Sequence, residues 1–236
     1  MLEHEFPELQ SETLRRMSRA DHYNAWLVER SLPYLGARVL DLGAGIGTFT
    51  SLLTGNGRQV VALEPDPALR PALERRFAGS ASVQVLPHTV ESLAGGGLDE
   101  PFDSVVCFNV LEHIDNDLEA LRTVRRLLRP GGALLLLVPA HPALYGAVDR
   151  AVAHRRRYRR EPFRRLLGAA GMTVGELRYV NPVGAAGWLV SSRILQREQV
   201  PAGPLLLYDR LVPALRRLDR LRLPFGLSLW AICHPG

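Results

Sequence analysis

Five short apolar segments alternate with segments of helical periodicity, and this alternation limits the possible folds more than any other feature of the chain. The five segments span residues 37–42, 59–64, 82–86, 103–108 and 133–138. Such continuous apolar runs are typical of strands that are buried on both faces. Strands separated by helices need right-handed crossovers, so the sequence predicts an α/β fold with a mostly parallel sheet and helices on both faces.

The clearest helical pattern begins at Asn116, which with Glu119 has the spacing of a capping box. The glycine and proline of residues 129–132 predict its end. The apolar residues that share one face of this helix are Leu118, Leu121, Val124 and Leu128.

The remaining segments predict one domain with a helical cap. Residues 1–36 form the cap and residues 37–236 the domain, which contains a polar connection at 139–160 and a helical insertion at 181–222. The other predicted elements are a helix at 161–170, a sixth strand at 171–180 and a last strand at 226–233. The helical spacing in the insertion is carried by Tyr208, Leu211, Val212, Leu215 and Leu218, and a kink is expected at Pro213.

Composition excludes several classes of protein. No apolar run approaches the roughly 18 residues that a membrane span requires, and the acidic N-terminus lacks the apolar core of a secretion signal. Cys107 and Cys233 are isolated, which indicates a reduced, cytoplasmic setting. All 29 basic residues are arginine, so coding bias accounts for part of the isoelectric point of 9.7.

A glycine-rich turn joins the first predicted strand to a helix at residues 39–53. Glycine allows a ligand to approach the backbone closely. A dinucleotide-binding turn would need its third glycine at position 48, which is Thr48. Glu64 ends the second strand, 21 residues beyond Gly43, where a carboxylate can accept both hydroxyls of a ribose.

Four motifs carry a family resemblance: VLDLGAGIG, ALEPD, FDSVVCFNVLEHI and LLRPGGALLLLVP. In this order and spacing, over residues 37–138, the chain resembles the class I S-adenosylmethionine-dependent methyltransferases. The resemblance implies a Rossmann-like seven-stranded sheet with an antiparallel last strand. It also implies S-adenosylmethionine as the cofactor, lying across the carboxyl ends of the strands.

The resemblance also implies a set of cofactor-binding residues. Asp41 would orient the glycine loop or the cofactor's ammonium group, and Glu64 would bind the ribose. The adenine site departs from the family, because residues 88–91 offer no carboxylate at the usual place, so the backbone or Thr89 would replace it. The full set is Asp41, Gly43, Ala44, Gly45, Glu64, Pro65, Thr89, Val90 and Asn109.

Methyl transfer needs a general base only when the nucleophile carries a proton of high pKa. The candidates for this duty lie beyond the fourth and fifth strands, where α/β sheets bind ligands. They are His113, His141, Tyr145 and His154, and each could instead serve loop structure through hydrogen bonds. Residues 109–113 resemble a metal-carrying pattern of some quinone methyltransferases, but Asn109 replaces its first carboxylate, so no metal is predicted.

Residues 154–160 contain five arginines, one histidine and one tyrosine. This run could form an acceptor-facing lid, a solvated rim or a nucleic-acid grip. The flanking acids and the single aromatic residue argue against nucleic acid. In the lid interpretation Asp149 pairs with Arg155 or Arg156, and the loop is mobile without acceptor. The predicted acceptor-contacting residues are Tyr23, Trp26, Asp149 and Tyr158.

These observations predict methyl transfer to a small or medium-sized metabolite, either a natural product or a saccharide-type intermediate. Two rivals remain open: an RNA methyltransferase, and a protein of the same fold that uses its pocket for another reaction such as cyclisation. A monomer or a homodimer is expected.

Overall fold

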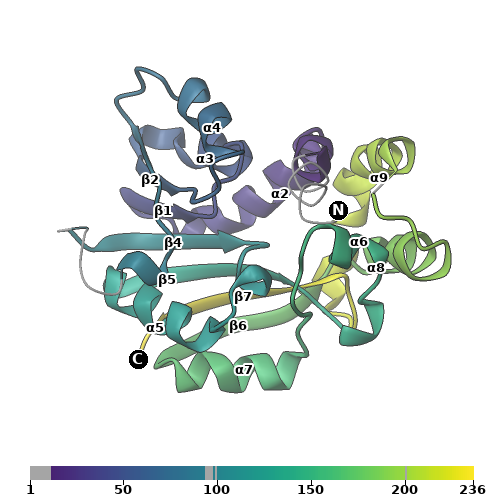
Figure 1. The fold of residues 1–236 in the computed structure, drawn as a ribbon. Helices are drawn as coiled ribbons and strands as arrows, with labels where there is room; N and C mark the ends of the chain where they lie inside the picture. Colours follow the sequence, from purple (N-terminus) through teal and green to yellow (C-terminus); the bar gives the residue numbers. More distant parts are fainter. Residues whose placement is uncertain (1–11, 94–97, 99, 200) are drawn as a thin grey trace.

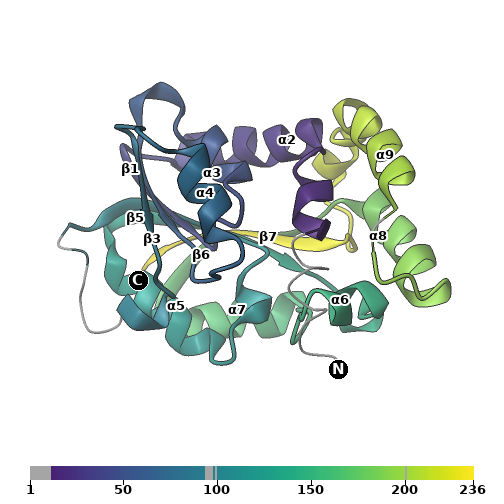
Figure 2. The same ribbon diagram turned by 45° about the horizontal axis from the view of Figure 1, so that its top comes forward.

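The computed structural model describes residues 12–93, 98, 100–199 and 201–236. These residues form one seven-stranded sheet with the strand order β3-β2-β1-β4-β5-β7-β6 (Figures 1 and 2). The strands are β1 (Arg38–Leu42), β2 (Gln59–Leu63), β3 (Val83–Leu86), β4 (Phe102–Phe108), β5 (Leu128–Pro139), β6 (Met172–Val180) and β7 (Ser228–Pro235). The first five strands pair in parallel, and β7 runs antiparallel between β5 and β6. The predicted fold class is confirmed.

The strand order reverses direction at β1. The chain runs outward from β1 to β2 and β3, and then returns to place β4 on the other side of β1. The loops that leave the carboxyl ends of β1 and β4 therefore diverge. A crevice at such a switch point is where open α/β sheets bind ligands.

Helices cover both faces of the sheet, which explains the unbroken apolar runs. Neighbouring residues of β1 enter different layers: Leu40 packs with residues of α5 and α7, whereas Val39 packs with residues of α2, α3 and α9. Figure 1 shows α5 and α7 on one side of the sheet and α2 and α3 on the other. The helices are α2 (Asp21–Ser31), α3 (Thr48–Leu53), α4 (Arg70–Arg76), α5 (Asp117–Leu127), α6 (Ala147–Ala151), α7 (Arg160–Ala169), α8 (Pro182–Trp188) and α9 (Ala202–Leu215).

The start of α5 agrees with its sequence and its end does not. The Asn116 side chain accepts a hydrogen bond from the Glu119 amide over 3.1 Å, as expected for the cap. Leu128, however, does not belong to the helix. It opens β5 and pairs with Phe102, and the register then shifts so that residues 129–132 bulge out of the ladder. Residues 129–132, predicted to end the helix, instead form a bulge in β5, which begins earlier than the predicted strand at 133–138.

The segment 139–160, predicted as a polar connection, folds back onto the sheet. It contains a short helix at Pro142–Leu144 and the helix α6. Tyr158 then forms a parallel bridge with Ala140; the Tyr158 amide donates to Pro139 and the His141 amide donates to Tyr158. The segment is thus a loop closed at its base by backbone hydrogen bonds. Its mobility without acceptor stays a prediction.

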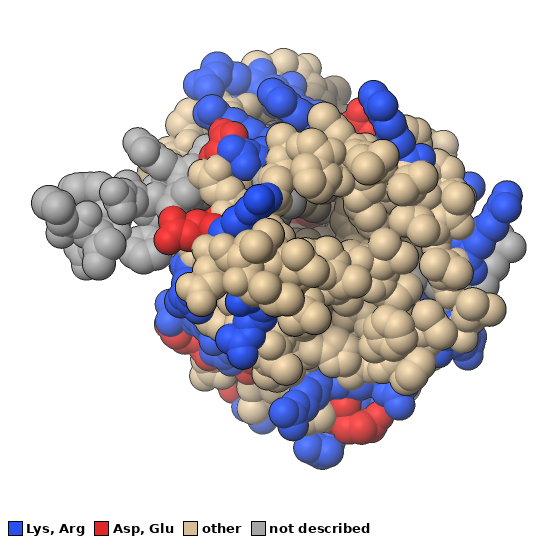
Figure 3. Space-filling view, turned by 90° about the vertical axis from the view of Figure 1, so that its right-hand side faces the viewer, with Lys and Arg blue, Asp and Glu red and all other residues tan. Residues whose placement is uncertain are grey.

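The helical cap and the helical insertion lie against each other. Residues 12–17 are helical and α2 follows, whereas residues 1–11 of the predicted cap lie outside the described part. The insertion continues α8 as a π-helix at Leu189–Ile194, and α9 contains Pro213 as expected. Figure 3 shows the side of the molecule that carries these helices. Among the described residues, no helix has both the length and the apolar character needed to cross a bilayer.

A single carboxylate joins α9 to the start of α2. Asp209 accepts hydrogen bonds from the amides of Tyr23 and His22, over 2.9 and 3.3 Å, and its Oδ2 lies 2.9 Å from the His22 ring. Amides at a helix start have no partner within their own helix, and Ala20 before α2 offers no side-chain acceptor. Asp209 supplies that acceptor from a helix far along the chain.

We expect Asp209→Ala to lower the free energy of unfolding by roughly 1–3 kcal/mol, because it leaves buried amides of α2 unpaired. Asp21→Ala, in the exposed first turn of the same helix, is the control and should cost at most about 0.5 kcal/mol. Urea unfolding of both variants measures the difference. Equal losses would show that Asp209 does not act as a cap.

Candidate active site

A cavity of about 670 Å³ lies at the crevice where the strand order reverses. Every predicted cofactor residue except Asp41 lines its wall: Gly43, Ala44, Gly45, Glu64, Pro65, Thr89, Val90 and Asn109. The loops that follow β1, β2, β3 and β4 supply these residues. The sequence therefore identified one end of the cavity residue by residue.

Packing against neighbouring side chains holds the glycine loop in its conformation. Gly43 has φ of +71°, and a Cβ there would lie 2.5 Å from a methyl carbon of Val110. Gly45 has φ of +58°, but a Cβ there would approach only Leu14, at 3.6 Å. Gly43 is thus required by the protein's own contacts, whereas Gly45 keeps its backbone open toward the cavity.

Glu64 is held by the same loop. Its Oε2 accepts a hydrogen bond from the Gly45 amide over 2.7 Å, and its Oε1 accepts one from the Asp66 amide over 2.9 Å. Burial raises the pKa of this carboxyl, and the two amide hydrogen bonds oppose the shift. Each carboxylate oxygen can accept a further hydrogen bond, so the group is positioned to receive two donors from the cavity.

Asp41 lies behind the loop, outside the cavity wall. It is 3% exposed, and its Oδ2 accepts a hydrogen bond of 2.6 Å from the Thr50 hydroxyl on α3. Burial raises the pKa of Asp41 to about 6. Of its two predicted roles, these contacts support orientation of the loop and its helix.

The segment after β3 lines the cavity with His88, Thr89, Val90 and Glu91. Thr89 does not have a free hydroxyl oxygen, because that oxygen accepts a hydrogen bond of 3.2 Å from the Ser92 amide. The hydroxyl hydrogen of Thr89 remains available to a ligand. Among these four residues only Glu91, the first residue of the short helix Glu91–Leu93, carries a carboxylate.

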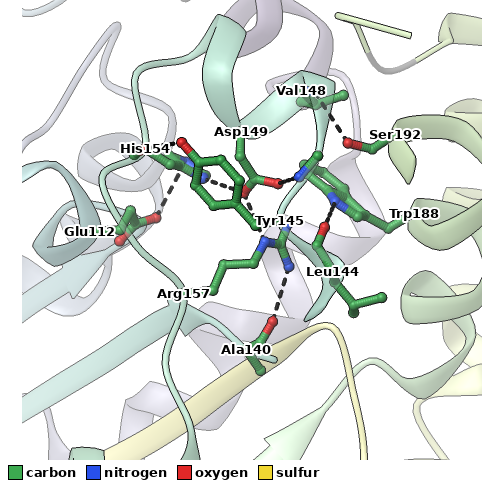
Figure 4. Close-up of polar contacts among 11 residues, drawn as sticks. Glu112, Ala140, Leu144, Tyr145, Val148, Asp149, His154, Arg157, Trp188 and Ser192 are labelled. Carbon is green, nitrogen blue, oxygen red and sulfur yellow. Dashed lines mark hydrogen bonds and ion pairs between the residues drawn. The ribbon is translucent and has the colours of Figure 1, made fainter. Parts of the chain in front are cut away.

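A buried polar cluster forms the other end of the site (Figure 4). Asp149 is fully buried, and its Oδ1 lies 2.8 Å from both His154 Nδ1 and Arg157 Nε. Its Oδ2 accepts a hydrogen bond from the Gly146 amide over 2.9 Å. Burial alone would raise the pKa of Asp149, but the bond to His154 and the charge of Arg157 outweigh it and hold that pKa low. His154 Nδ1 therefore carries the donated proton, which leaves Nε2 as the acceptor in the neutral ring.

Glu112 is the unsatisfied member of this cluster. Its side chain is fully buried, and neither carboxylate oxygen has a hydrogen-bond partner among the described residues. His154 Nε2 lies 3.6 Å from Oε1. Burial raises the pKa of Glu112 to about 7, with His154 opposing the shift. A carboxyl with such a pKa exchanges its proton near neutral pH.

Two histidine rings meet beside Glu112. His113 and His154 both line the cavity, and their ring centroids lie 4.9 Å apart. Burial lowers the pKa of His113 to about 4, so this ring is neutral at physiological pH. The ligand-type atoms of Glu112, His113 and His154 lie within 4.8 Å of one another, so this trio could hold a metal ion. The sequence-based expectation of no metal stays a prediction.

The structure removes two of the predicted catalytic side chains from the cavity wall. The His141 ring stacks on Tyr179, with centroids 4.5 Å apart and ring planes at 12°. The Tyr145 hydroxyl donates to the His154 carbonyl over 2.6 Å. Tyr145 thus positions the backbone of His154, and His141 packs against β6.

Three predicted acceptor contacts also lie outside the cavity wall, whereas Tyr23 lines it. Trp26 is 7% exposed and packs against Tyr23 and Arg30. Tyr158 packs on Phe163, and its hydroxyl bonds to Asp117 over 3.1 Å. Asp149 acts through His154 and cannot reach an acceptor itself. In each case, tertiary packing determines which way the side chain points, and the local sequence does not record it.

Of the five arginines in the run, Arg157 is buried, Arg156 is half-buried and the other three are exposed. Arg157 pairs with Asp149 and stacks 4.6 Å from the Trp188 ring, while Arg156 pairs with Asp117 over 2.9 Å. Arg155 pairs with Asp115 and donates to the His113 carbonyl. The predicted pairing of Asp149 with Arg155 or Arg156 is wrong. Because the chain is extended at the Ala140–Tyr158 bridge, Arg157 turns inward where its neighbour Arg156 does not.

The sequence reasoning missed Glu112, Arg157 and Trp188, which complete the polar end of the site. One signal was available for Glu112. It is an acid within the apolar stretch that follows β4, next to His113. Burying an unpaired carboxylate costs folding free energy, so an acid at such a position indicates a functional role. Trp188 comes from the insertion, far along the chain, and the fold brings it to the cavity wall.

Comparison with known proteins agrees with this geometry. The model of a family described as "Methyltransferase domain" matches residues 4–177. A ubiquinone biosynthesis O-methyltransferase of Xanthomonas campestris is 38% identical over 103 residues, which cover 43% of this chain and 42% of that protein. The chain thus matches less than half the length of this curated relative.

Solved structures of low sequence identity share the fold. A SAM-dependent methyltransferase from Archaeoglobus fulgidus has a TM-score of 0.63 at 16% identity, covering 91% of this chain and 94% of that one. The N-methyltransferase NodS from Bradyrhizobium japonicum, solved with S-adenosyl-L-homocysteine, has a TM-score of 0.58 at 15% identity, covering 90% and 85%.

The unsatisfied carboxyl of Glu112 makes a prediction about stability and pH. Its pKa is raised from 4.5 to about 7 by folding, so the folded chain retains a proton that the unfolded chain releases. This carboxyl therefore makes the natural chain less stable as pH rises through this window, and Glu112→Gln removes that contribution. We expect Glu112→Gln to gain, relative to the natural chain, on the order of 3 kcal/mol between pH 4.5 and pH 8.

Urea unfolding at several pH values measures this gain. Glu119→Gln, which removes an exposed carboxyl on α5, is the control and should follow the natural chain. If Glu112→Gln also runs parallel to the natural chain, the buried carboxyl is ionised throughout.

Proposed function

The chain belongs to the methyltransferase-domain family, and from this membership we propose that it methylates a hydroxyl group of a small molecule held in the cavity. The cofactor of this enzyme is S-adenosylmethionine. One observation carries the proposal: a single cavity connects the glycine loop and Glu64 at one end with His154 at the other. Donor and acceptor can therefore be held side by side.

The residues present fit this cofactor. Glu64 offers two positioned acceptor atoms to a ribose, and the open backbone at Gly45 leaves room for the amino-acid part. When bound, the cofactor supplies an activated methyl group on sulfur. Holding two reactants in a near-attack arrangement can lower the activation barrier by roughly 7–11 kcal/mol.

We expect Glu64→Ala to weaken the binding of S-adenosylmethionine by roughly 1.5–3 kcal/mol, the range for hydrogen bonds to a charged group. Glu91→Ala, which removes another carboxylate of the cavity wall, should change affinity much less. Isothermal titration calorimetry measures both, and NAD serves as a ligand that should not bind because Thr48 replaces the third glycine. Unchanged affinity of Glu64→Ala would refute the ribose role.

His154 is the general base of the proposed reaction. Asp149 accepts the hydrogen bond that Nδ1–H donates and thereby fixes the tautomer, as a carboxylate does for a catalytic histidine. Nε2 then accepts the proton that the acceptor hydroxyl loses as its oxygen attacks the methyl carbon. Arg157 and the Gly146 amide hold Asp149 in place. The neutral ring of His113 lies beside His154 and adds no positive charge that would repel a protonated His154.

We expect His154→Asn to lower single-turnover methyl transfer by about 10²–10⁴-fold, the usual contribution of a general base. Affinity for S-adenosylmethionine should stay nearly unchanged. His141→Asn is the matched control, because that ring lies outside the cavity wall. Turnover by the natural chain should also survive a chelator. Loss of turnover with chelator would assign the Glu112, His113 and His154 trio to a metal instead.

The acceptor class rests on the chemistry of the site and on the relative. A hydroxyl keeps its proton at neutral pH and so requires a base, which matches the role proposed for His154. The Xanthomonas relative is named for O-methylation in ubiquinone biosynthesis. We propose an O-methyltransferase of small metabolites, including natural products and saccharide-type intermediates. Turnover of a panel of phenols and sugars tests the class.

A further inference from the structure

The helical insertion exposes a concentration of large apolar side chains. Of thirteen such exposed side chains among the described residues, ten lie between residues 183 and 225. Ile194 and Leu207 are 65% and 62% exposed, far more than isolated surface leucines need be. The ten are Val183, Leu189, Val190, Ile194, Leu195, Leu206, Leu207, Leu211, Leu221 and Phe225.

The helix α9 is apolar on two opposite sides. Leu205 and Val212, seven residues apart, are buried in the layer that α9 shares with α2. Leu207 and Leu211, four residues apart, point away from that layer and are exposed. A helix of an isolated globular protein is polar on its outer side. The outer side of α9 is therefore built to contact something apolar.

Arginines surround this apolar area. Arg193, Arg197, Arg210, Arg217 and Arg222 are all exposed, and Glu198 is the only exposed acid among the described residues 182–218. Figure 3 shows a broad uncharged face with many basic and fewer acidic side chains around its edge, and with a hollow near its middle. We call this area, the ten apolar side chains with these five arginines, the insertion face.

We propose that the insertion face binds the surface of an anionic lipid bilayer. Apolar side chains that enter the interface and a basic rim that meets lipid phosphates are the two contributions such binding needs. A second copy of the chain fits less well. In a symmetric dimer the two rims would bring arginines against arginines, with little acid to pair them.

The insertion face lies next to the cavity, so membrane binding would bring the cavity close to the bilayer. The helix α8 carries Val183 of the face and also Trp188 of the cavity wall. Val148 of α6 and Val152, which follows that helix, belong to the same wall. A bilayer bound to the face would lie beside the cavity. An acceptor that is partly lipid could then reach the cavity without crossing water.

Co-sedimentation with vesicles tests the proposal on the full chain. We expect at least about tenfold more binding to vesicles with one third phosphatidylglycerol than to pure phosphatidylcholine. Ile194→Gln/Leu207→Gln/Leu211→Gln should lower this binding at least about fivefold, and so should Arg193→Glu/Arg197→Glu. The control Arg75→Glu/Arg165→Glu makes the same charge change at exposed positions on α4 and α7, and should bind like the natural chain.

Three results would overturn the proposal. The first is no binding to anionic vesicles, and the second is an equal loss in the control, which would show an effect of net charge alone. The third is a dimer in sedimentation velocity that the glutamine variant dissociates, which would make a second copy the occupant. S-adenosylmethionine titration of each variant is scored separately. If the chain binds S-adenosylmethionine but not vesicles, only the proposed membrane binding is rejected. If it binds vesicles but not S-adenosylmethionine, only the proposed function is rejected.

Discussion

The buried carboxylate of Asp149 is the interaction on which the acceptor end of the molecule depends. A charge without solvent must be fully paired, and removal of one partner from such a pair is commonly worth several kcal/mol. Asp149 meets this requirement with Arg157, His154 and the Gly146 amide, all from one segment of the chain. The segment can satisfy its buried charge only in the folded arrangement, which places His154 in the cavity wall.

Two further buried carboxylates, Glu64 and Glu112, are held in opposite ways. Glu64 is paired by backbone amides of a rigid loop, so it is an acceptor with fixed geometry. Glu112 is equally buried and has no such donors, so burial keeps its proton affinity high. The first arrangement suits the binding of neutral hydroxyls, and the second suits the acceptance of charge or of a proton.

The sequence predicted the cofactor end of the site much better than the acceptor end, and the reason is physical. The glycine loop and Glu64 follow directly from buried strands, and strand ends in a parallel sheet fall at known places. The side chains of residues 139–160 depend on a bridge between Ala140 and Tyr158 and on acids from another loop, Asp115 and Asp117. Periodicity holds no information about such contacts. Arg157 and Tyr158 are neighbours in sequence, yet one pairs with Asp149 and the other packs on Phe163.

The insertion shows the same limit at the surface. Its sequence predicts a helix from the spacing of five residues, and the fold divides that set between the interior and the surface: Tyr208, Leu211, Val212, Leu215 and Leu218. Val212 is buried against α2 while Leu211 is 49% exposed, because consecutive residues of a helix are about 100° apart and cannot face one neighbour. A helix this rich in leucine has more apolar surface than its own domain can cover. The remainder must be offered to solvent or to a second phase, and the arginines at its edge make a charged lipid surface the phase that suits it.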